Sequence, residues 1–156
     1  MDEAVSEPDG RIMASPSPEA WTLLIEQCMD ELDGRDRELP EDRLVWLAQR
    51  LQEFLGLRAW WVAAAFEREL VTVDSSGHGP VQGPIDRGDD AQLLIDGCDP
   101  DAQEWLLVLQ REPGGYDLRL VRPLVTALVY AALGFPRAPA ASAVRWPARR
   151  MLHSTA

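Results

Sequence analysis

The sequence contains no lysine and no asparagine, and all fifteen of its basic residues are arginine. Without lysine the chain can neither form a Schiff base nor place the lysine of a P-loop on a nucleotide phosphate, which excludes several large enzyme classes. Cysteine is also scarce. Cys28 and Cys98 are too few for a disulfide framework and lack the spacing of a zinc site. These absences favour a reducing compartment and a protein without metal or cofactor.

Positive charge is scarce as well. The 26 acidic residues outnumber the arginines and give a net charge of -11. A chain this acidic repels the phosphate backbone of nucleic acids, so direct nucleic-acid binding is disfavoured. The start of the chain has acids where a signal peptide has cations, and no apolar run is long enough to span a membrane. We expect a soluble, cytoplasmic protein.

Length and composition indicate one folded domain between two charged ends. The 156 residues, 46% of them hydrophobic, suffice for a single core. Residues 1–16 have too few apolar side chains to offset the entropy of ordering and are predicted to form a disordered acidic arm. Residues 136–156 contain four arginines and no acid, which predicts a basic, proline- and arginine-rich tail. The domain is therefore expected at residues 17–135.

Apolar spacing predicts three helices. Ser17 can cap a helix in which apolar residues recur at helical spacing until Gly34. A second helix is expected from Glu41 to Gly56, where a glycine can adopt the left-handed cap conformation. A third, long helix is expected from about Leu118 to Leu133, where apolar residues cover more than half of the circumference.

Four segments are typical of strands. Residues 59–66 and 70–73 are apolar and suit a hairpin, and residues 91–95 and 104–110 suit two more strands. Residues 75–90 contain four glycines and form the longest irregular stretch within the domain. Together the segments predict an α+β fold with an antiparallel sheet of four to five strands, covered by the N-terminal helices and the long C-terminal helix.

The chain resembles a compact GAF domain, the small-molecule sensory module of many bacterial regulators, over about residues 38–135. Residues 103–117, from the end of a turn through Glu112-Pro113-Gly114-Gly115, are similar to the family's last strand, turn and final helix start. The helix from Glu41 into Gly56-Leu57-Arg58-Ala59-Trp60-Trp61 is similar to its first helix and strand. The Asn-Lys-Phe-Asp-Glu set of cyclic-nucleotide-binding members is missing, because the chain has neither asparagine nor lysine.

A candidate ligand site is predicted around the adjacent tryptophans Trp60 and Trp61. Neighbours on a strand point to opposite faces, and small residues beside an aromatic ring leave room for a cavity. The alternative interpretation is that these side chains are ordinary core residues. The candidate ligand-binding residues are Trp60, Trp61, Ala63, Ala65, Leu70, Thr72, His78 and Trp105.

Two further surfaces are candidates for protein contacts. Trp146 lies among arginines in the tail, where an aromatic ring and charge-assisted hydrogen bonds can anchor a partner, although a solubilising tail has the same composition. The partner-binding candidates are Arg145, Trp146, Arg149 and Arg150. The long helix has enough apolar surface for the sheet and for a second subunit, so a homodimer is expected. The dimer candidates are Val121, Leu124, Val125 and Leu128.

No catalytic site is expected. His78 lies near Asp74, Ser75 and Ser76, but known catalytic triads gather residues from distant parts of a chain. The favoured function is a non-enzymatic GAF-like sensory or regulatory domain that binds a small molecule or a regulatory protein partner as a dimer, with residues 75–90 responding to the ligand. The alternative is a protein-protein interaction adaptor without a ligand pocket that binds through its charged termini. An enzyme of unfamiliar type is the least favoured interpretation.

Overall fold

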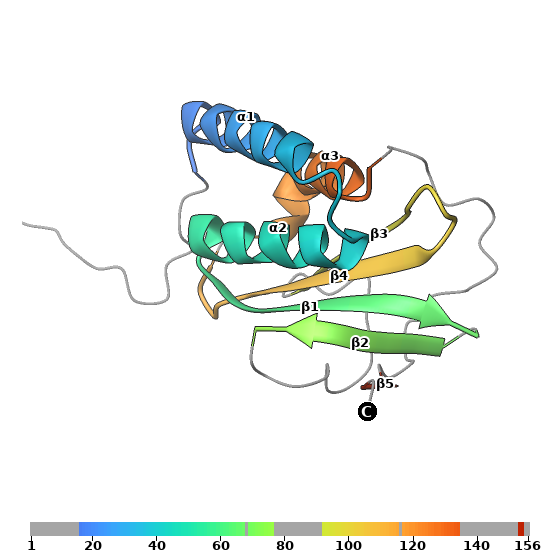
Figure 1. The fold of residues 1–156 in the computed structure, drawn as a ribbon. Helices are drawn as coiled ribbons and strands as arrows, with labels where there is room; N and C mark the ends of the chain where they lie inside the picture. Colours follow the sequence, from blue (N-terminus) through green and yellow to red (C-terminus); the bar gives the residue numbers. More distant parts are fainter. Residues whose placement is uncertain (1–15, 68, 77–91, 116, 135–152, 155–156) are drawn as a thin grey trace, which may run out of the picture.

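The protein is an α+β structure in which the helices cover one face of an open sheet (Figure 1). The computed structural model describes residues 16–67, 69–76, 92–115, 117–134 and 153–154. Their order is α1 (Pro18–Gly34), α2 (Pro40–Leu55), β1 (Leu57–Phe66), β2 (Glu69–Ser75), β3 (Gln92–Cys98), β4 (Glu104–Arg111), the 3-10 helix η1 (Leu118–Val121), α3 (Arg122–Ala132) and β5 (His153–Ser154).

Helix α1 begins and helix α2 ends at the residue that its cap predicts. The Ser17 hydroxyl accepts a hydrogen bond from the Ala20 amide at 3.1 Å and satisfies one of the free donors at the start of α1. At the end of α2, Gly56 adopts a left-handed conformation with φ 66°, which glycine enters without steric cost. The predicted helix boundaries are confirmed at both places.

The sheet has the strand order β3-β4-β1-β2-β5. Its four long strands are antiparallel, and the two residues of β5 pair in parallel with β2 at Val71 and Thr72. The predicted β1–β2 hairpin is present, and its turn lacks an Asn-Gly pair; instead Glu67 takes the left-handed conformation with φ 51°. The antiparallel α+β sheet expected from the sequence is therefore confirmed for its four long strands.

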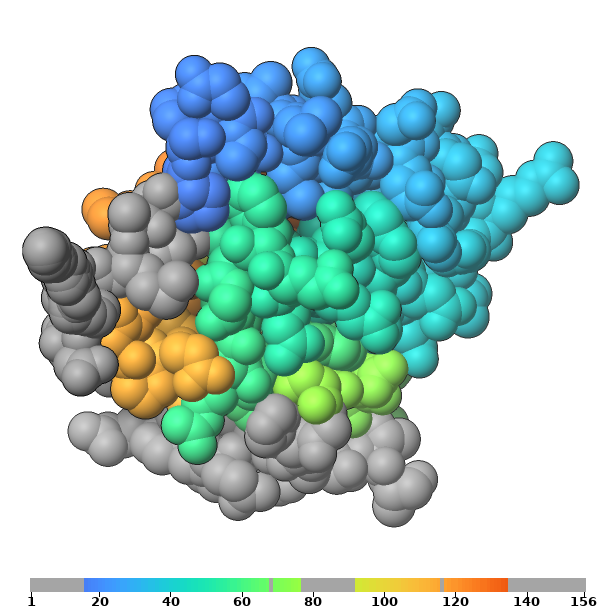
Figure 2. Space-filling view, turned by 90° about the vertical axis from the view of Figure 1, so that its left-hand side faces the viewer, coloured from blue at the N-terminus to red at the C-terminus, as the bar shows by residue number. Residues whose placement is uncertain are grey.

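The core lies between the helices and the sheet. Helix α2 packs across β1 and β4, α3 packs on β3, and α1 lies outside them, as its position above α2 in Figure 2 shows. Trp21 of α1 meets Phe54 of α2 edge to face, with ring centroids 4.9 Å apart. The continuous apolar run of β1 is buried on both sides of the sheet, as the sequence pattern predicts for a central strand.

The C-terminal helix is shorter than the predicted span of residues 118–133. The chain first forms η1, and α3 starts at Arg122 with Pro123 in its first turn. Proline has no amide to donate to the carbonyl four residues earlier, here Arg119, and its ring collides with that carbonyl. An α-helix therefore cannot continue through Pro123 from Leu118.

Helix α3 approaches β3 closely at Gly97. A Cβ atom built on Gly97 would lie 2.8 Å from Cδ1 of Leu133 and 3.1 Å from Cε1 of Tyr130. The missing side chain therefore sets the distance between α3 and the sheet. No helix within the described ranges is long and apolar enough to cross a membrane.

Candidate functional site

The predicted pocket residues divide between the two faces of the sheet. Trp61, Ala63 and Leu70 belong to a buried cluster on the face without described helices, and Thr72, the pairing partner of Ala63, is also buried. Ala65 pairs with Leu70 on the same strands. The structure therefore brings these predicted residues together on neighbouring positions of β1 and β2.

Trp60 and Trp105 lie on the other face, in the main core beneath the helices. The indole Nε1 of Trp60 donates to the Gln52 side-chain oxygen at 3.1 Å, and that of Trp105 donates to Oδ2 of Asp99 at 3.1 Å. Buried indoles with satisfied N–H groups are typical of core tryptophans. For these two residues the geometry matches the core interpretation.

Several predicted residues lie outside the described ranges. These are His78 of the candidate pocket and the partner-binding candidates Arg145, Trp146, Arg149 and Arg150. In the loop of residues 75–90, on which the predicted ligand response depends, Ser75 is the last residue of β2, and residues 77–90 also lie outside the described ranges.

The dimer candidates of the C-terminal helix are packed inside their own protomer. Val121, Val125 and Leu128 are buried in the main core, and Leu124 packs against it. Helix α3 contacts α1 and α2 as well as β3, so its wide apolar surface already has neighbours within the chain. The composition of this helix therefore does not by itself require a second subunit.

A cavity lined by described residues lies elsewhere, where the ends of the helices meet. It has a volume of about 510 Å³. Figure 1 shows the end of α1, the start of α2 and the β3–β4 turn on the same side of the molecule. The lining residues are Met29, Leu32, Asp33, Asp36, Arg43, Pro100, Ala131 and Gly134.

Arg43 is the buried charged residue of this cavity, with only 6% of its surface exposed. Its Nε donates to the carbonyl oxygen of Ala132 at 2.6 Å. Its Nη1 donates to the carbonyl oxygens of Glu38, Arg35 and Asp36. The guanidinium therefore joins the last turn of α3 to the α1–α2 connection, where backbone carbonyls have no helical partner.

The second terminal nitrogen of Arg43, Nη2, makes no hydrogen bond within the described part of the chain. It lies 3.7 Å from the position that a Cβ of Gly134, another lining residue, would occupy. No described carboxylate forms an ion pair with this guanidinium. Donor capacity at the cavity wall therefore remains after the backbone contacts are made.

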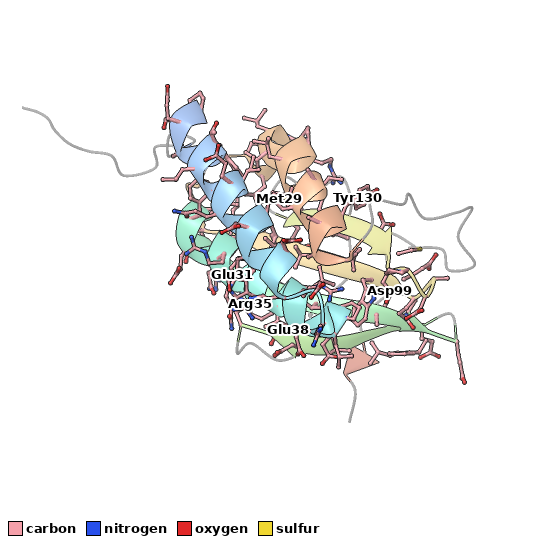
Figure 3. All side chains as sticks on the ribbon, turned by 45° about the horizontal axis from the view of Figure 1, so that its top comes forward. Met29, Glu31, Arg35, Glu38, Asp99 and Tyr130 are labelled. Carbon is pink, nitrogen blue, oxygen red and sulfur yellow. The ribbon has the colours of Figure 1, made fainter. Side chains whose placement is uncertain are left out.

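Arg35 orders the α1–α2 connection that supplies three of those carbonyls. Its guanidinium pairs with Glu31 at 2.9 Å and with Glu38 at 3.0 Å and lies 5.2 Å from the ring centroid of Trp46. Figure 3 labels Glu31, Arg35 and Glu38 near one another. Burial acts to lower the pKa of Arg35, but the hydrogen bonds that Arg35 donates to Glu38 and Glu31 outweigh it and raise this pKa. The connection is thus fixed by contacts to both α1 and α2.

Asp99 holds the opposite wall. This carboxylate is 4% exposed, and its Oδ1 accepts the amides of Asp101 and Gln103 at 2.9 and 3.0 Å. Its Oδ2 accepts the indole N–H of Trp105. These bonds fix the β3–β4 turn and with it Pro100, which lines the cavity.

Two exposed carboxylates stand at the cavity, Asp33 at the end of α1 and Asp36 in the connection that follows. Neither side chain forms an ion pair or hydrogen bond in the ranges that the structure describes. The cavity thus combines one buried cation, two carboxylates and an apolar wall from Met29 and Leu32.

The cysteines are placed away from solvent. Cys28 has no exposed surface and lies in the main core, and Cys98 is also buried. Burial raises the pKa of the Cys28 thiol, an effect that the charge of Arg50 partly offsets. A thiol of this kind is a poor nucleophile.

Within the described ranges, no group of three or more histidine, cysteine or acidic residues is arranged to hold a metal ion.

The buried role of Arg43 was missed from the sequence, although a signal for it exists. Leu47 and Leu51 follow Arg43 at four and eight positions and are both fully buried, so Arg43 lies on the inward side of α2. An arginine on that side must find acceptors.

No protein-family model, curated protein or solved structure matches the chain.

Proposed function

We propose that the protein is a non-enzymatic sensory or regulatory domain that binds a small molecule in the cavity beside Arg43. The observation that carries this proposal is the combination of a cavity of about 510 Å³ with a 6% exposed arginine whose Nη2 has no described acceptor. Small-molecule sites have volumes in this range and use a few fixed polar groups on an apolar wall.

The lining side chains support a binding role over a catalytic one. Among the described lining residues there is no histidine, cysteine, serine or tyrosine, and the two carboxylates, Asp33 and Asp36, are exposed. The guanidinium of Arg43 offers hydrogen-bond donors and no acceptor. Its donors suit the recognition of a fixed acceptor.

A ligand in this cavity has a route to the rest of the fold. The lining residues come from α1, the α1–α2 connection, α2, the β3–β4 turn and the end of α3. A ligand that prefers one arrangement of these ends changes the population of that arrangement, and the outer surface of α1 changes with it. In this mechanism, ligand binding changes the surface that the helices present to a regulatory partner.

The GAF-like assignment and the homodimer are part of the proposal. The order α2, β1–β2, β3–β4 and α3 follows the order of elements on which the resemblance depends. The buried Val121, Val125 and Leu128 do not supply a dimer surface, so a dimer would form through the exposed parts of the helix layer or through the other face of the sheet.

Native mass spectrometry of protein purified gently from its own source tests this function. The proposal predicts a defined adduct of small-molecule mass, and the same spectrum gives the oligomeric state. Met29→Trp adds volume at the cavity wall, and because Met29 is 39% exposed we expect the variant to fold. The adduct should disappear in this variant and persist in the control variant Arg58→Met, which changes an exposed residue of β1. An adduct-free wild-type protein would contradict the proposal.

A second candidate function is an interaction adaptor that uses the outer face of α1. This helix contains five acidic residues and no basic one, and its Leu23 is 55% exposed. Leu23 lies in a shallow hollow of about 370 Å³ with Pro18, Glu19, Thr22 and Glu26. An apolar side chain among acids suits a partner with a basic, partly apolar segment. Of the charged termini that the sequence suggested for this role, only Pro16 and the two residues of β5 are among the described residues.

Site-specific photo-cross-linking separates the two candidates. A photoreactive residue at position 23 should capture one protein of defined mass if α1 is the docking surface, and the same residue at exposed position 58 should not. Equal capture from both positions, or none from position 23, would remove the adaptor function.

A further inference from the structure

The charges around the cavity specify the class of ligand. We infer that the cavity binds a molecule with a carboxylate at one end and a cationic group at the other. This molecule has the size of a basic amino acid or a short basic peptide. This inference rests on the proposed function, in which the cavity is a ligand site.

Arg43 provides the contact for the carboxylate. Its Nε and Nη1 are used by backbone carbonyls, which fix the plane of the guanidinium. Nη2 retains its donors on the side of Gly134, within the same lining. An arginine held in this way is preorganised for an oxyanion, because no side-chain freedom remains to be lost on binding. Its positive charge has no carboxylate partner in the described chain, so a ligand carboxylate supplies the missing counter-charge.

Asp33 and Asp36 provide the contact for the cation. Both line the cavity, and neither has an ion-pair partner in the parts of the chain that are described. They repel a free phosphate or dicarboxylate that approaches Arg43, because like charges at short range raise its energy. A ligand that brings a cation to these two residues removes the repulsion. The cavity therefore selects for both charges together.

The apolar part of the lining sets the body of the ligand. Met29, Leu32, Pro100 and Ala131 line the same cavity as the charged groups and offer contacts to methylene carbons. An aliphatic chain of the length found in arginine or lysine matches such a wall. The volume of about 510 Å³ accommodates one such residue or a short peptide and is too small for a folded segment.

The competing account is that Arg43 acts only as a strut between α2, α3 and the α1–α2 connection. Its backbone contacts alone would then explain its burial, and the two aspartates would be ordinary exposed residues. This account predicts that no ligand senses the charge of Asp33 or Asp36. Replacing Arg43 itself does not decide the matter, because the variant loses four backbone contacts and is destabilised whether or not the cavity binds a ligand.

The test titrates the full-length, 15N-labelled protein with three closely related probes, followed by amide chemical shifts. N-acetyl-L-arginine carries both charges, N-acetyl-L-citrulline keeps the shape and the carboxylate without the cation, and N-acetyl-L-argininamide keeps the cation without the carboxylate. We expect N-acetyl-L-arginine to shift amides around Asp33, Asp36 and Gly134, and each control to bind at least about tenfold more weakly.

Matched protein variants complete the test. Asp33→Asn and Asp36→Asn change exposed side chains, so both variants should fold. They should weaken the binding of N-acetyl-L-arginine about threefold or more and leave that of N-acetyl-L-citrulline unchanged. Glu26→Gln, two helical turns before Asp33 on α1 and outside the cavity lining, should change neither. Equal binding of the three probes, shifts located elsewhere, or no binding of N-acetyl-L-arginine would overturn the inference. The proposed function fails separately, by the absence of any adduct in the native mass spectrum.

Discussion

Arg43 and Ala132, 89 residues apart in the chain, are joined by a 2.6 Å hydrogen bond from the Nε of the arginine to the backbone carbonyl of the alanine. The bond links the first turn of α2 to the last turn of α3. The same guanidinium reaches the carbonyls of Arg35, Asp36 and Glu38. A charge buried to this extent is tolerated because its hydrogen bonds replace those of water. One side chain therefore fixes three walls of the cavity.

Replacing this arginine should destabilise the fold measurably. Arg43→Met keeps the aliphatic volume but leaves four carbonyl oxygens without their donor, which should cost roughly 2–4 kcal/mol of unfolding free energy. Arg58→Met, at an exposed position, should stay within about 0.5 kcal/mol of wild type. Urea unfolding followed by tryptophan fluorescence measures both. Equal midpoints for the two variants would show that the buried contacts contribute nothing.

The approach of α3 to the sheet predicts a contrast between two glycines. Gly97→Ala should destabilise the protein by about 1–3 kcal/mol, because the new Cβ meets Leu133 and Tyr130 at less than contact distance. Gly34→Ala should be neutral or slightly stabilising, because a Cβ there meets nothing within 4 Å and the residue ends a helix. Thermal unfolding of both variants tests the pair. Equal melting temperatures of the Gly97→Ala and Gly34→Ala variants would show that α3 lies farther from β3 than the structure has it.

The Asp99–Trp105 hydrogen bond predicts that substitutions at these two residues have coupled effects on the free energy of unfolding. Asp99→Asn keeps one oxygen for the Asp101 and Gln103 amides but turns an N–H group toward the indole N–H of Trp105. Two donors that face each other in a buried site should cost about 1–3 kcal/mol. Trp105→Phe removes the indole donor, so in the double variant the Asp99→Asn cost should shrink. A double-mutant cycle in urea measures the coupling, and strictly additive effects would contradict the bond.

The carboxylate of Asp117, at the start of η1, predicts that the stability of the folded protein depends on pH. The Arg119 side chain and amide bond to this carboxylate and lower its pKa from 3.8 to about 2. A lowered folded-state pKa stabilises the protein fully above pH 3.8, and the contribution is lost as the pH falls toward 2. The carbon resonance of the Asp117 carboxyl should titrate near 2 and move toward 3.8 in Arg119→Gln. An unchanged midpoint in that variant would assign the shift to another cause.

Local signals in the sequence predict local structure well in this protein. Ser17 and Gly56 mark helix ends through interactions with their own neighbours, and both boundaries are confirmed. Side chains alternate along a strand, which places Trp60 and Trp61 on opposite faces of β1. This two-residue period does not say which of the two tryptophans the helices cover. Pro123 carries a local signal that was outweighed by the apolar pattern around it, which is why the C-terminal helix was predicted too long.

The cavity could not be predicted in the same way because its parts are distant in the chain. The acceptor at Ala132 and the wall at Pro100 come next to Arg43 only after the sheet has placed β3 beside β4 and α3 upon them. The sequence can show that Arg43 lies on the inward side of α2. It does not show that the carbonyls of two other elements meet it there.

The central claim is that the cavity beside Arg43 is a ligand site, and a crystal structure of the protein purified gently from its own source tests it most directly. The account predicts electron density for a small organic molecule in that cavity, with an oxygen atom within hydrogen-bond distance of Arg43 Nη2 and a cationic group at Asp33 or Asp36. A cavity that contains only ordered water, in protein whose native mass carries no adduct, would contradict the account and leave Arg43 as a strut between helix ends.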